Sequence, residues 1–209
     1  MLRASPPLWN VVIGGLALVG LAAVAPAMPA LAGPGDGLSA YDQGDYATAY
    51  RELAPAAAAG DPLAQYTLAR MYFSGVGVSR DVGEGFKWLR KAALAGIGAA
   101  QYQLGAHYEW GIDVAQDYAE AARWYRMAAD RSVAEAQFRL GLLYMDGRGI
   151  PPDLVAAHMW LNLAAARLSP GEARNTVMKL RESVGTKLTA AQIAEAHNAA
   201  RDWTPVAAH

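Results

Sequence analysis

The most regular feature of this sequence is a pattern of apolar and small residues that returns every 36 positions. The segments Asp61 to Gly96, Ile97 to Ser132 and Val133 to Leu168 align with one another without gaps. Nine columns are identical in all three copies, and in the first copy they are Ala64, Gln65, Leu68, Tyr72, Gly75, Asp81, Trp88, Ala92 and Ala93. A fixed period of this length indicates a repeat protein, in which each copy is one structural unit.

Within each copy, the spacing of the apolar residues predicts two helices. Ala64, Leu68 and Tyr72 lie four apart, on one face of a first helix. Leu89 and Ala92 mark one face of a second helix, and the pair is expected to form an antiparallel hairpin. Such a hairpin cannot cover its apolar faces alone, so successive hairpins must stack. The sequence therefore predicts an all-α fold, an α-solenoid of stacked antiparallel helix hairpins.

The glycine-rich stretch between the two helices, "SGVGVSRD" in the first copy, is predicted to be a turn. Gly75 and Gly77 allow the positive φ angles that end the first helix. Asp81 is expected to cap the second helix, with Glu84 three residues later completing a capping box. The stretch lacks the GK[ST] ending of a phosphate loop and the alternating acidic ligands of an EF-hand. Its predicted role is structural.

The segments on either side of the three copies read as caps of the solenoid. Asp45 and Gly60 stand at the register of Asp81 and Gly96, which indicates a shortened first unit, and this unit resembles a tetratricopeptide repeat. After the third copy, a helix start at Ser169 and a second one at Thr189 predict two capping helices. The predicted segments are a shortened unit at 33–60, repeats at 61–96, 97–132 and 133–168, and C-terminal capping helices at 169–209.

The first 32 residues differ in kind from the rest of the chain. Arg3 is their only charged side chain, and an apolar run from Leu8 to Ala25 reaches about 18 residues. Ala30 and Ala32 place small residues before Gly33, which predicts a signal peptide at 1–32 and a mature protein in the periplasm or outside the cell. The alternative is an uncleaved helix that anchors the protein in the inner membrane.

Composition narrows the classes of partner. The 209 residues are 54% hydrophobic and 18% charged, enough to bury a core of single-domain size. A formal net charge of -1 and a sequence pI near 6.4 give no electrostatic reason to expect nucleic acid or an anionic membrane surface. A membrane is expected as a partner only if the N-terminal segment stays uncleaved. With no cysteine, the chain has no disulfide and no thiolate metal site.

The sequence offers no arrangement typical of catalysis, of a metal site or of a cofactor site. The four histidines are scattered over different units without metal-ligand spacing. No GxSxG nucleophile motif occurs. Glu109 and Asp113 lie four apart as a candidate acid pair, but a solvated helix end accounts for them better. We therefore expect no catalytic residues, no metal, no cofactor and no enzymatic activity.

The repeated motifs resemble a known family. Segments such as "AQYTLARMYFSGVGVSRDVGEGFKWLRKAALAG" are similar to Sel-like repeats, which are relatives of the tetratricopeptide repeat. The resemblance implies a right-handed α-solenoid that acts as a scaffold for protein assembly, often in bacterial envelopes or membrane-linked complexes. Secreted members described as hydrolases are rich in cysteine, so that precedent does not extend to this chain. Asp113 stands where the family has its second loop glycine, and the second loop is expected to differ.

Two functional hypotheses follow. The first is a periplasmic scaffold that binds a peptide or a partner domain on the concave face formed by the first helices. The second is a factor that binds envelope polysaccharide or peptidoglycan, or hydrolyses it weakly. An acid pair in a groove would favour the second, and the sequence does not clearly supply one.

The columns that vary between copies indicate where a partner would bind. By analogy with tetratricopeptide repeats, the expected contact residues are Tyr66, Arg70 and Phe73, then Tyr102, Glu109 and Trp110, then Phe138, Leu142 and Met145. The alternative for Tyr66, Tyr102 and Phe138 is inward packing, because they are almost a repeated column themselves. The invariant tryptophans Trp88, Trp124 and Trp160 are assigned to the core.

Overall fold

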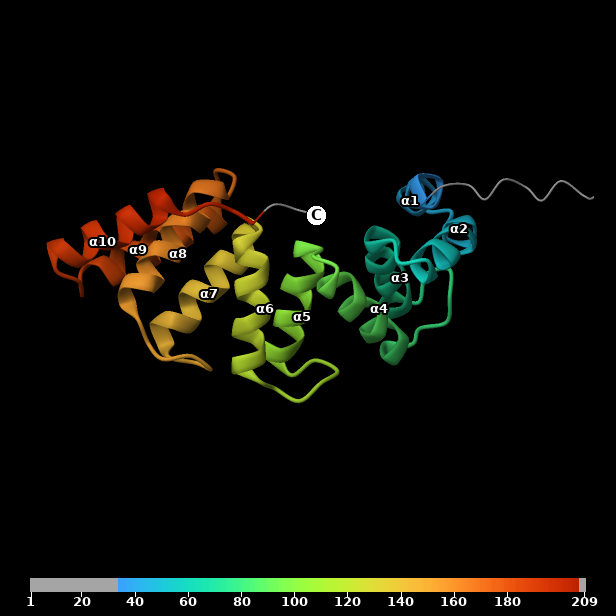
Figure 1. Ribbon diagram of the computed structural model, residues 1–209, viewed down its shortest axis with the longest axis horizontal. Helices are drawn as coiled ribbons and strands as arrows, with labels where there is room; N and C mark the ends of the chain where they lie inside the picture. The colour runs from blue at the N-terminus through green and yellow to red at the C-terminus, as the bar shows by residue number, and fades with distance from the viewer. Residues whose placement is uncertain (1–33, 207–209) are drawn as a thin grey trace, which may run out of the picture. The chain divides into compact units, whose positions relative to one another are not determined.

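The computed structural model describes residues 34–206, which form ten helices and no strand. Figure 1 shows the helices in chain order. Their bounds are α1 (Pro34–Asp42), α2 (Tyr46–Ala58), α3 (Pro62–Ser74), α4 (Val82–Leu94), α5 (Gly98–Trp110), α6 (Tyr118–Asp130), α7 (Ala134–Asp146), α8 (Leu154–Arg167), α9 (Glu172–Gly185) and α10 (Ala190–Asp202). The signal peptide expected at 1–32 lies outside the described residues. None of the helices between residues 34 and 206 is long and apolar enough to cross a membrane.

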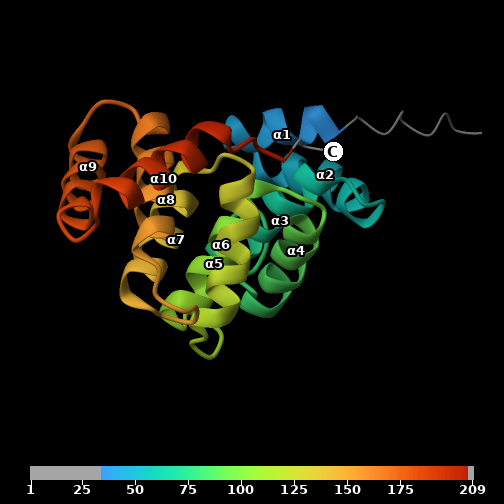
Figure 2. The same cartoon turned by 60° about the vertical axis from the view of Figure 1, so that its left-hand side comes forward.

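The helices pack as hairpins that stack in chain order. α1 packs on α2, α3 on α4, α5 on α6, and α7 on α8, and each hairpin also contacts the next through α2 and α3, α4 and α5, or α6 and α7. α9 and α10 both pack against α8, and Figure 2 shows these last helices together at the C-terminal end of the stack. The predicted α-solenoid of antiparallel hairpins is confirmed.

The hydrophobic core is shared between neighbouring units. One cluster of buried residues includes Ala69 of α3, Leu89 of α4, Leu104 of α5 and Trp124 of α6, so a single cluster connects two hairpins. Because every cluster depends on side chains from the next unit, no hairpin buries its apolar face without a neighbour.

The invariant tryptophans lie where the sequence predicts. Trp124 is 8% exposed and Trp160 is 2% exposed. Trp88 is half-buried, and the ammonium group of Lys91 lies 4.1 Å from the centroid of its ring. The assignment of these residues to packing is therefore confirmed.

The invariant glutamines join each unit to the one before it. Each glutamine is buried near the start of a first helix, and its Nε2 donates a hydrogen bond to a carbonyl in the last turn of the preceding second helix. Each of these carbonyls also accepts a backbone N–H from the turn that follows its helix, so the glutamine adds a second bond that joins the two units. The pairs are Gln65 to Ala57 at 3.1 Å, Gln101 to Ala93 at 2.9 Å, and Gln137 to Ala129 at 3.1 Å.

The loops between paired helices have the same backbone conformation in all three repeats. Gly75, Gly111 and Gly147 end α3, α5 and α7 in the left-handed conformation, as predicted. Asp113 has a φ of 62°, close to the 72° of Gly77 at the same position of the first loop. The expectation that Asp113 would alter the second loop is therefore wrong. Aspartate is one of the few residues other than glycine that tolerate this conformation.

The predicted capping box at the start of α4 forms only in part. The side chain of Asp81 accepts a hydrogen bond from the backbone N–H of Glu84 at 3.0 Å, as expected. The backbone N–H of Asp81 donates to the carbonyl of Tyr72 instead of to the Glu84 carboxylate, which pairs with Lys87 at 2.9 Å. The capping aspartates of the other two loops make the same backbone bond, to Tyr108 and Tyr144. This bond closes each loop across the hairpin.

The C-terminal helices end the stack. Thr189 and Gln192 form the predicted capping box of α10, whereas the N-cap of α9 is Gly171 rather than the serine and proline before it. Beyond α10, the ring centroid of Trp203 lies 6.2 Å from that of Trp160, and the backbone N–H of Val206 donates to the carbonyl of Asp130 at 2.7 Å. The chain thus returns to contact α6 after its last helix.

Candidate partner-binding face

The first helices of consecutive hairpins carry aromatic and basic side chains that reach the surface. Tyr41 comes from α1, Arg70 and Phe73 from α3, Gln103 and Trp110 from α5, and Arg139 from α7. We call these six residues the first-helix face. They fall into two groups, one at the junction of α1, α3 and α5 and one at the junction of α5 and α7.

The first group surrounds a shallow pocket of about 320 Å³ lined by Tyr41, Arg70, Phe73, Ser74 and Gln103. The guanidinium carbon of Arg70 lies 4.9 Å from the ring centroid of Tyr41, a cation–π arrangement that fixes an exposed side chain. No carboxylate within residues 34–206 forms an ion pair with Arg70. Its N–H groups can therefore bind acceptors on a partner.

Phe73 packs between helices, although the variability of its column between repeats predicts a surface contact residue. Its ring stacks on the imidazole of His107 with centroids 5.3 Å apart and meets the edge of Phe86 at 6.1 Å. The side chain is half-buried. Phe73 thus lines the pocket and also holds α3 against α4 and α5.

The second group is built around an exposed tryptophan. The side chain of Trp110 is 54% exposed, and the guanidinium carbon of Arg139 lies 5.4 Å from its ring centroid. Nη1 of Arg139 lies 3.7 Å from Oε1 of Glu109. The carboxylate therefore draws Arg139 back toward α5 and places its guanidinium beside the indole.

Glu109 does not lie on the surface, contrary to its expected role as a contact residue. The residue is 6% exposed, and its Oε2 accepts a hydrogen bond of 2.6 Å from the hydroxyl of Tyr125. Gly105, one turn earlier on α5, makes room for the Tyr125 ring, because a Cβ there would lie 2.7 Å from that ring. Burial, followed by the bond to Glu109, raises the pKa of Tyr125. Glu109 therefore supports the face from inside.

Glu109 and Asp113 do not form the acid pair considered from the sequence. Glu109 binds Tyr125 and lies near Arg139. Asp113 approaches Nδ1 of His107, with its Oδ2 3.8 Å away. The two carboxylates thus have separate partners, so this pair gives no support for the glycosidase alternative.

The other predicted contact residues are half-buried. Tyr66 packs against the cluster that contains Leu89, and burial raises its pKa. The ring centroid of Tyr102 lies 5.7 Å from that of Tyr125. Phe138 and Met145 pack against the cluster that contains Val177, and Leu142 is half-buried on α7. These contacts favour the alternative of inward packing for Tyr66, Tyr102 and Phe138.

Three residues of the face were missed by sequence reasoning. Tyr41 lies in the shortened unit, where no repeated column marks the register. Gln103 and Arg139 occupy one column, which holds Thr67 in the first repeat and directly precedes the invariant leucine. That column differs in every copy, so variability next to an invariant core position was the signal that could have identified them.

No group of three or more histidine or acidic side chains in the described part of the chain could hold a metal ion. The first-helix face also lacks a nucleophile paired with a base. Its chemistry is that of an interface, with aromatic rings, guanidinium groups and an amide.

Comparison with known proteins agrees with the repeat architecture. A model of the Sel1 repeat matches residues 62–97, 98–133 and 134–167, just over half of the 209 residues. No match is found among curated proteins.

Two solved structures share the fold. A Sel1 repeat protein from Oxalobacter formigenes is 32% identical with a TM-score of 0.60, over 63% of this chain and 54% of that one. A protective antigen present in uropathogenic Escherichia coli strains, which displays an SLR fold, is 31% identical with a TM-score of 0.63, over 75% of this chain and 32% of that one. This chain therefore matches about half the length of the first relative and about a third of the second. The repeats, the stacked hairpins and these similarities together show that the chain belongs to the Sel1 repeat family.

Proposed function

We propose that this chain is a non-enzymatic scaffold of the bacterial cell envelope that binds a peptide or a partner domain on its first-helix face. Sel1 repeat proteins generally mediate protein–protein interactions. The observation that carries the proposal is the pair of cation–aromatic contacts on successive first helices, Arg70 over Tyr41 and Arg139 beside Trp110, in each of which one partner is exposed.

These residue types are suited to protein recognition. Tryptophan, tyrosine and arginine dominate the energetics of protein interfaces, because they bury a large area and lose little conformational freedom. Trp110 exposes about half of its side chain to water, and covering it would release the free energy of apolar burial. Arg70 and Arg139 are already held by aromatic rings, so less side-chain entropy would be lost when a partner binds.

The envelope location is supported by the small-residue site before Gly33 and by the apolar run that precedes it. An exported mature chain is expected to begin at Gly33. Intact mass measurement of the protein from the periplasmic fraction tests this directly. A full-length chain recovered from the inner membrane would favour the anchored alternative.

The binding face is tested by site-specific photocrosslinking in the native host. A photoreactive amino acid at Gln103 or at Trp110 is expected to capture the same protein. Met127, which is 39% exposed on the second helix α6, is the matched control position and is expected to yield no such adduct. Equal capture from Met127 would contradict the proposed face.

The polysaccharide alternative makes a different prediction for the same residues. Cosedimentation with purified peptidoglycan that is lost in W110A but retained in M127A would favour glycan binding over a protein scaffold. The scaffold proposal predicts no cosedimentation above that of an unrelated soluble protein.

A further inference from the structure

The third repeat places an imidazole where the first two repeats have apolar side chains. His158 occupies the column of Phe86 and Ala122. It is 4% exposed, and its Nδ1 has no hydrogen-bond partner among the described residues. A buried polar atom without a partner costs free energy, so packing alone does not explain this substitution.

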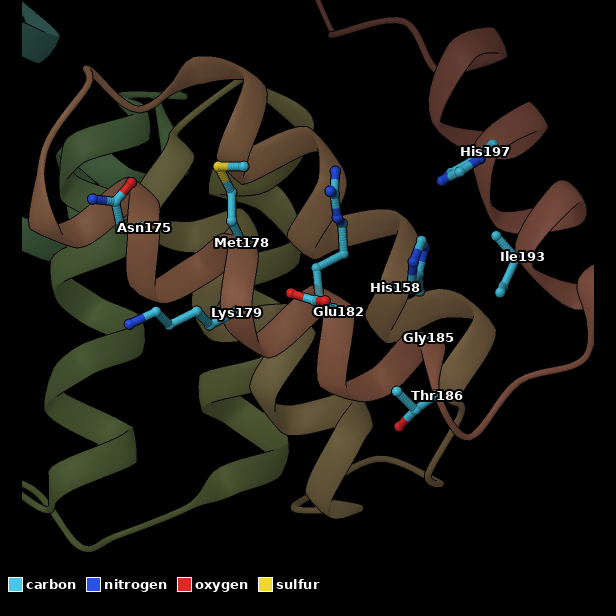
Figure 3. Close-up of a pocket in the computed structure, with 10 residues that line it drawn as sticks. His158, Asn175, Met178, Lys179, Glu182, Gly185, Thr186, Ile193 and His197 are labelled. Atoms are coloured by element: carbon cyan, nitrogen blue, oxygen red, sulfur yellow. The ribbon is translucent and has the colours of Figure 1, made fainter.

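His158 lines a pocket of about 720 Å³ bordered by α8, α9 and α10 (Figure 3). His197 of α10 also lines this pocket and lies beside His158, with ring centroids 5.2 Å apart. The volume lies within the range of pockets that hold small molecules. This pocket is separate from the first-helix face, so its function does not depend on the function proposed above.

The pocket wall is rich in hydrogen-bond donors. Arg181 of α9 lines it and is oriented by a bond of 2.7 Å from its Nη1 to Oδ1 of Asn162. Burial lowers the pKa of His158 most, and the nearby His197 and Arg181 lower it further. Lys179 and Glu182 also line the pocket from α9, so its charged residues are two cations and one carboxylate beside the two imidazoles.

We propose that this pocket binds a small anion bearing a carboxylate or phosphate group, with His158, His197 and Arg181 as its recognition residues. The imidazoles and the guanidinium would donate hydrogen bonds to the anion. Arg181 and Lys179 also make the pocket less favourable for a metal cation than for an anion. Because an anion stabilises the protonated imidazoles, affinity rises as the pH falls, and for His158, whose pKa is lowered by burial, this gain comes below the ordinary histidine value of about 6.5.

The test is a titration of the full mature protein with sodium phosphate and, separately, with sodium citrate, in an otherwise anion-poor buffer at pH 6.0 and pH 7.5. Histidine side-chain NMR signals report the occupant directly. Saturation is expected to shift the signals of His158 and His197 together and to raise the pKa of both. Citrate binding without phosphate binding would assign the pocket to carboxylates, and the reverse result would assign it to phosphates.

Variants separate this site from general charge attraction. H197Q removes an exposed imidazole from the pocket and is expected to weaken binding at pH 6.0 at least tenfold. R201Q removes a cation from the same helix outside the pocket and is expected to bind normally. H158F restores the residue of the first repeat and is expected to abolish binding. If H158F does not fold, the NMR titration of the wild-type protein still shows whether an anion binds beside His158 and His197.

Two results would overturn the proposal. One is the absence of any change in the His158 and His197 signals at millimolar phosphate and citrate. The other is equal weakening of binding in R201Q and H197Q, which would indicate attraction to the surface of α10 rather than a built site.

Discussion

The hydroxyl of Tyr125 donates a hydrogen bond of 2.6 Å to the carboxylate of Glu109, and this bond joins the two helices of the second repeat. The same carboxylate lies 3.7 Å from Arg139 of the next repeat. One buried acid thus connects three helices, and it fixes the guanidinium that lies beside Trp110. The candidate binding face therefore depends on an internal contact between units.

Substitution Y125F is expected to destabilise the protein by about 1.5–3 kcal/mol, because it removes a hydrogen bond to a charged group and leaves the carboxylate buried. Urea unfolding of the purified protein measures the effect. Y102F is the control, since the hydroxyl of Tyr102 makes no hydrogen bond within residues 34–206 and its loss is expected to change stability by less than about 0.5 kcal/mol. Equal stability of Y125F and wild type would contradict the importance of this bond.

Gly149 and Gly44 both have positive φ angles, 70° and 80°, but only Gly149 is closely packed. A Cβ at Gly149 would overlap the backbone of Tyr118, whereas a Cβ at Gly44 would meet nothing within 4 Å. G44A is expected to cost about 1–2 kcal/mol from backbone strain alone. G149A is expected to cost at least about 2 kcal/mol more, because the overlapping atoms are backbone and cannot move aside. Similar melting temperatures of the two variants would show that the third loop does not contact α6 as described.

The invariant and the variable tryptophans are expected to behave differently when truncated. W124A removes a side chain that is 8% exposed and is expected to cost about 3–5 kcal/mol. W110A removes a side chain that is 54% exposed and is expected to cost less than about 1 kcal/mol. Thermal unfolding monitored by circular dichroism checks both. A W124A protein that melts like wild type would show that Trp124 is not a core residue.

His158 is expected to make the protein sensitive to acid. Its pKa in the folded protein is lowered, mainly by burial, so the unfolded chain binds more protons as the pH falls through the ordinary value of about 6.5. The stability that depends on neutral His158 is complete above that value and is lost as the pH falls toward the folded pKa. The unfolding free energy of wild type relative to H158F is therefore expected to fall between pH 7.5 and pH 5. A constant difference between the two proteins over this interval would argue against a lowered pKa.

Local periodicity was enough to predict the hairpins, because every repeat must stack on its neighbours and has the same residues at the positions where it does so. The invariant tryptophans pack between helices, the loop glycines allow the turns, and the capping aspartates begin the second helices. The predicted hydrogen bond from the backbone N–H of Asp81 to the side chain of Glu84 does not form, because this N–H donates to the carbonyl of Tyr72 across the loop. That competing acceptor becomes adjacent only when the hairpin folds.

The candidate site was less predictable, because exposure of a variable column depends on its neighbours in space. Glu109 looked like a surface acid at a helix end, yet Tyr125 and Arg139 enclose it from two other helices. Phe73 varied between copies and still packs on His107. Tyr41 joined the face only because α1 packs near α3. Each of these outcomes rests on contacts between units rather than on spacing within one.

The central claim is that the first-helix face binds a protein partner, and the most direct test is the dissociation constant for the partner identified by crosslinking. The double variant R70A/W110A is expected to raise this constant at least tenfold, or about 1.4 kcal/mol. Its thermal unfolding is expected to stay close to that of wild type, because both side chains are exposed. The matched control R90A/M127A removes an exposed cation and an exposed apolar side chain from the second helices α4 and α6. An unchanged dissociation constant for folded R70A/W110A, or equal weakening in the control, would contradict the claim.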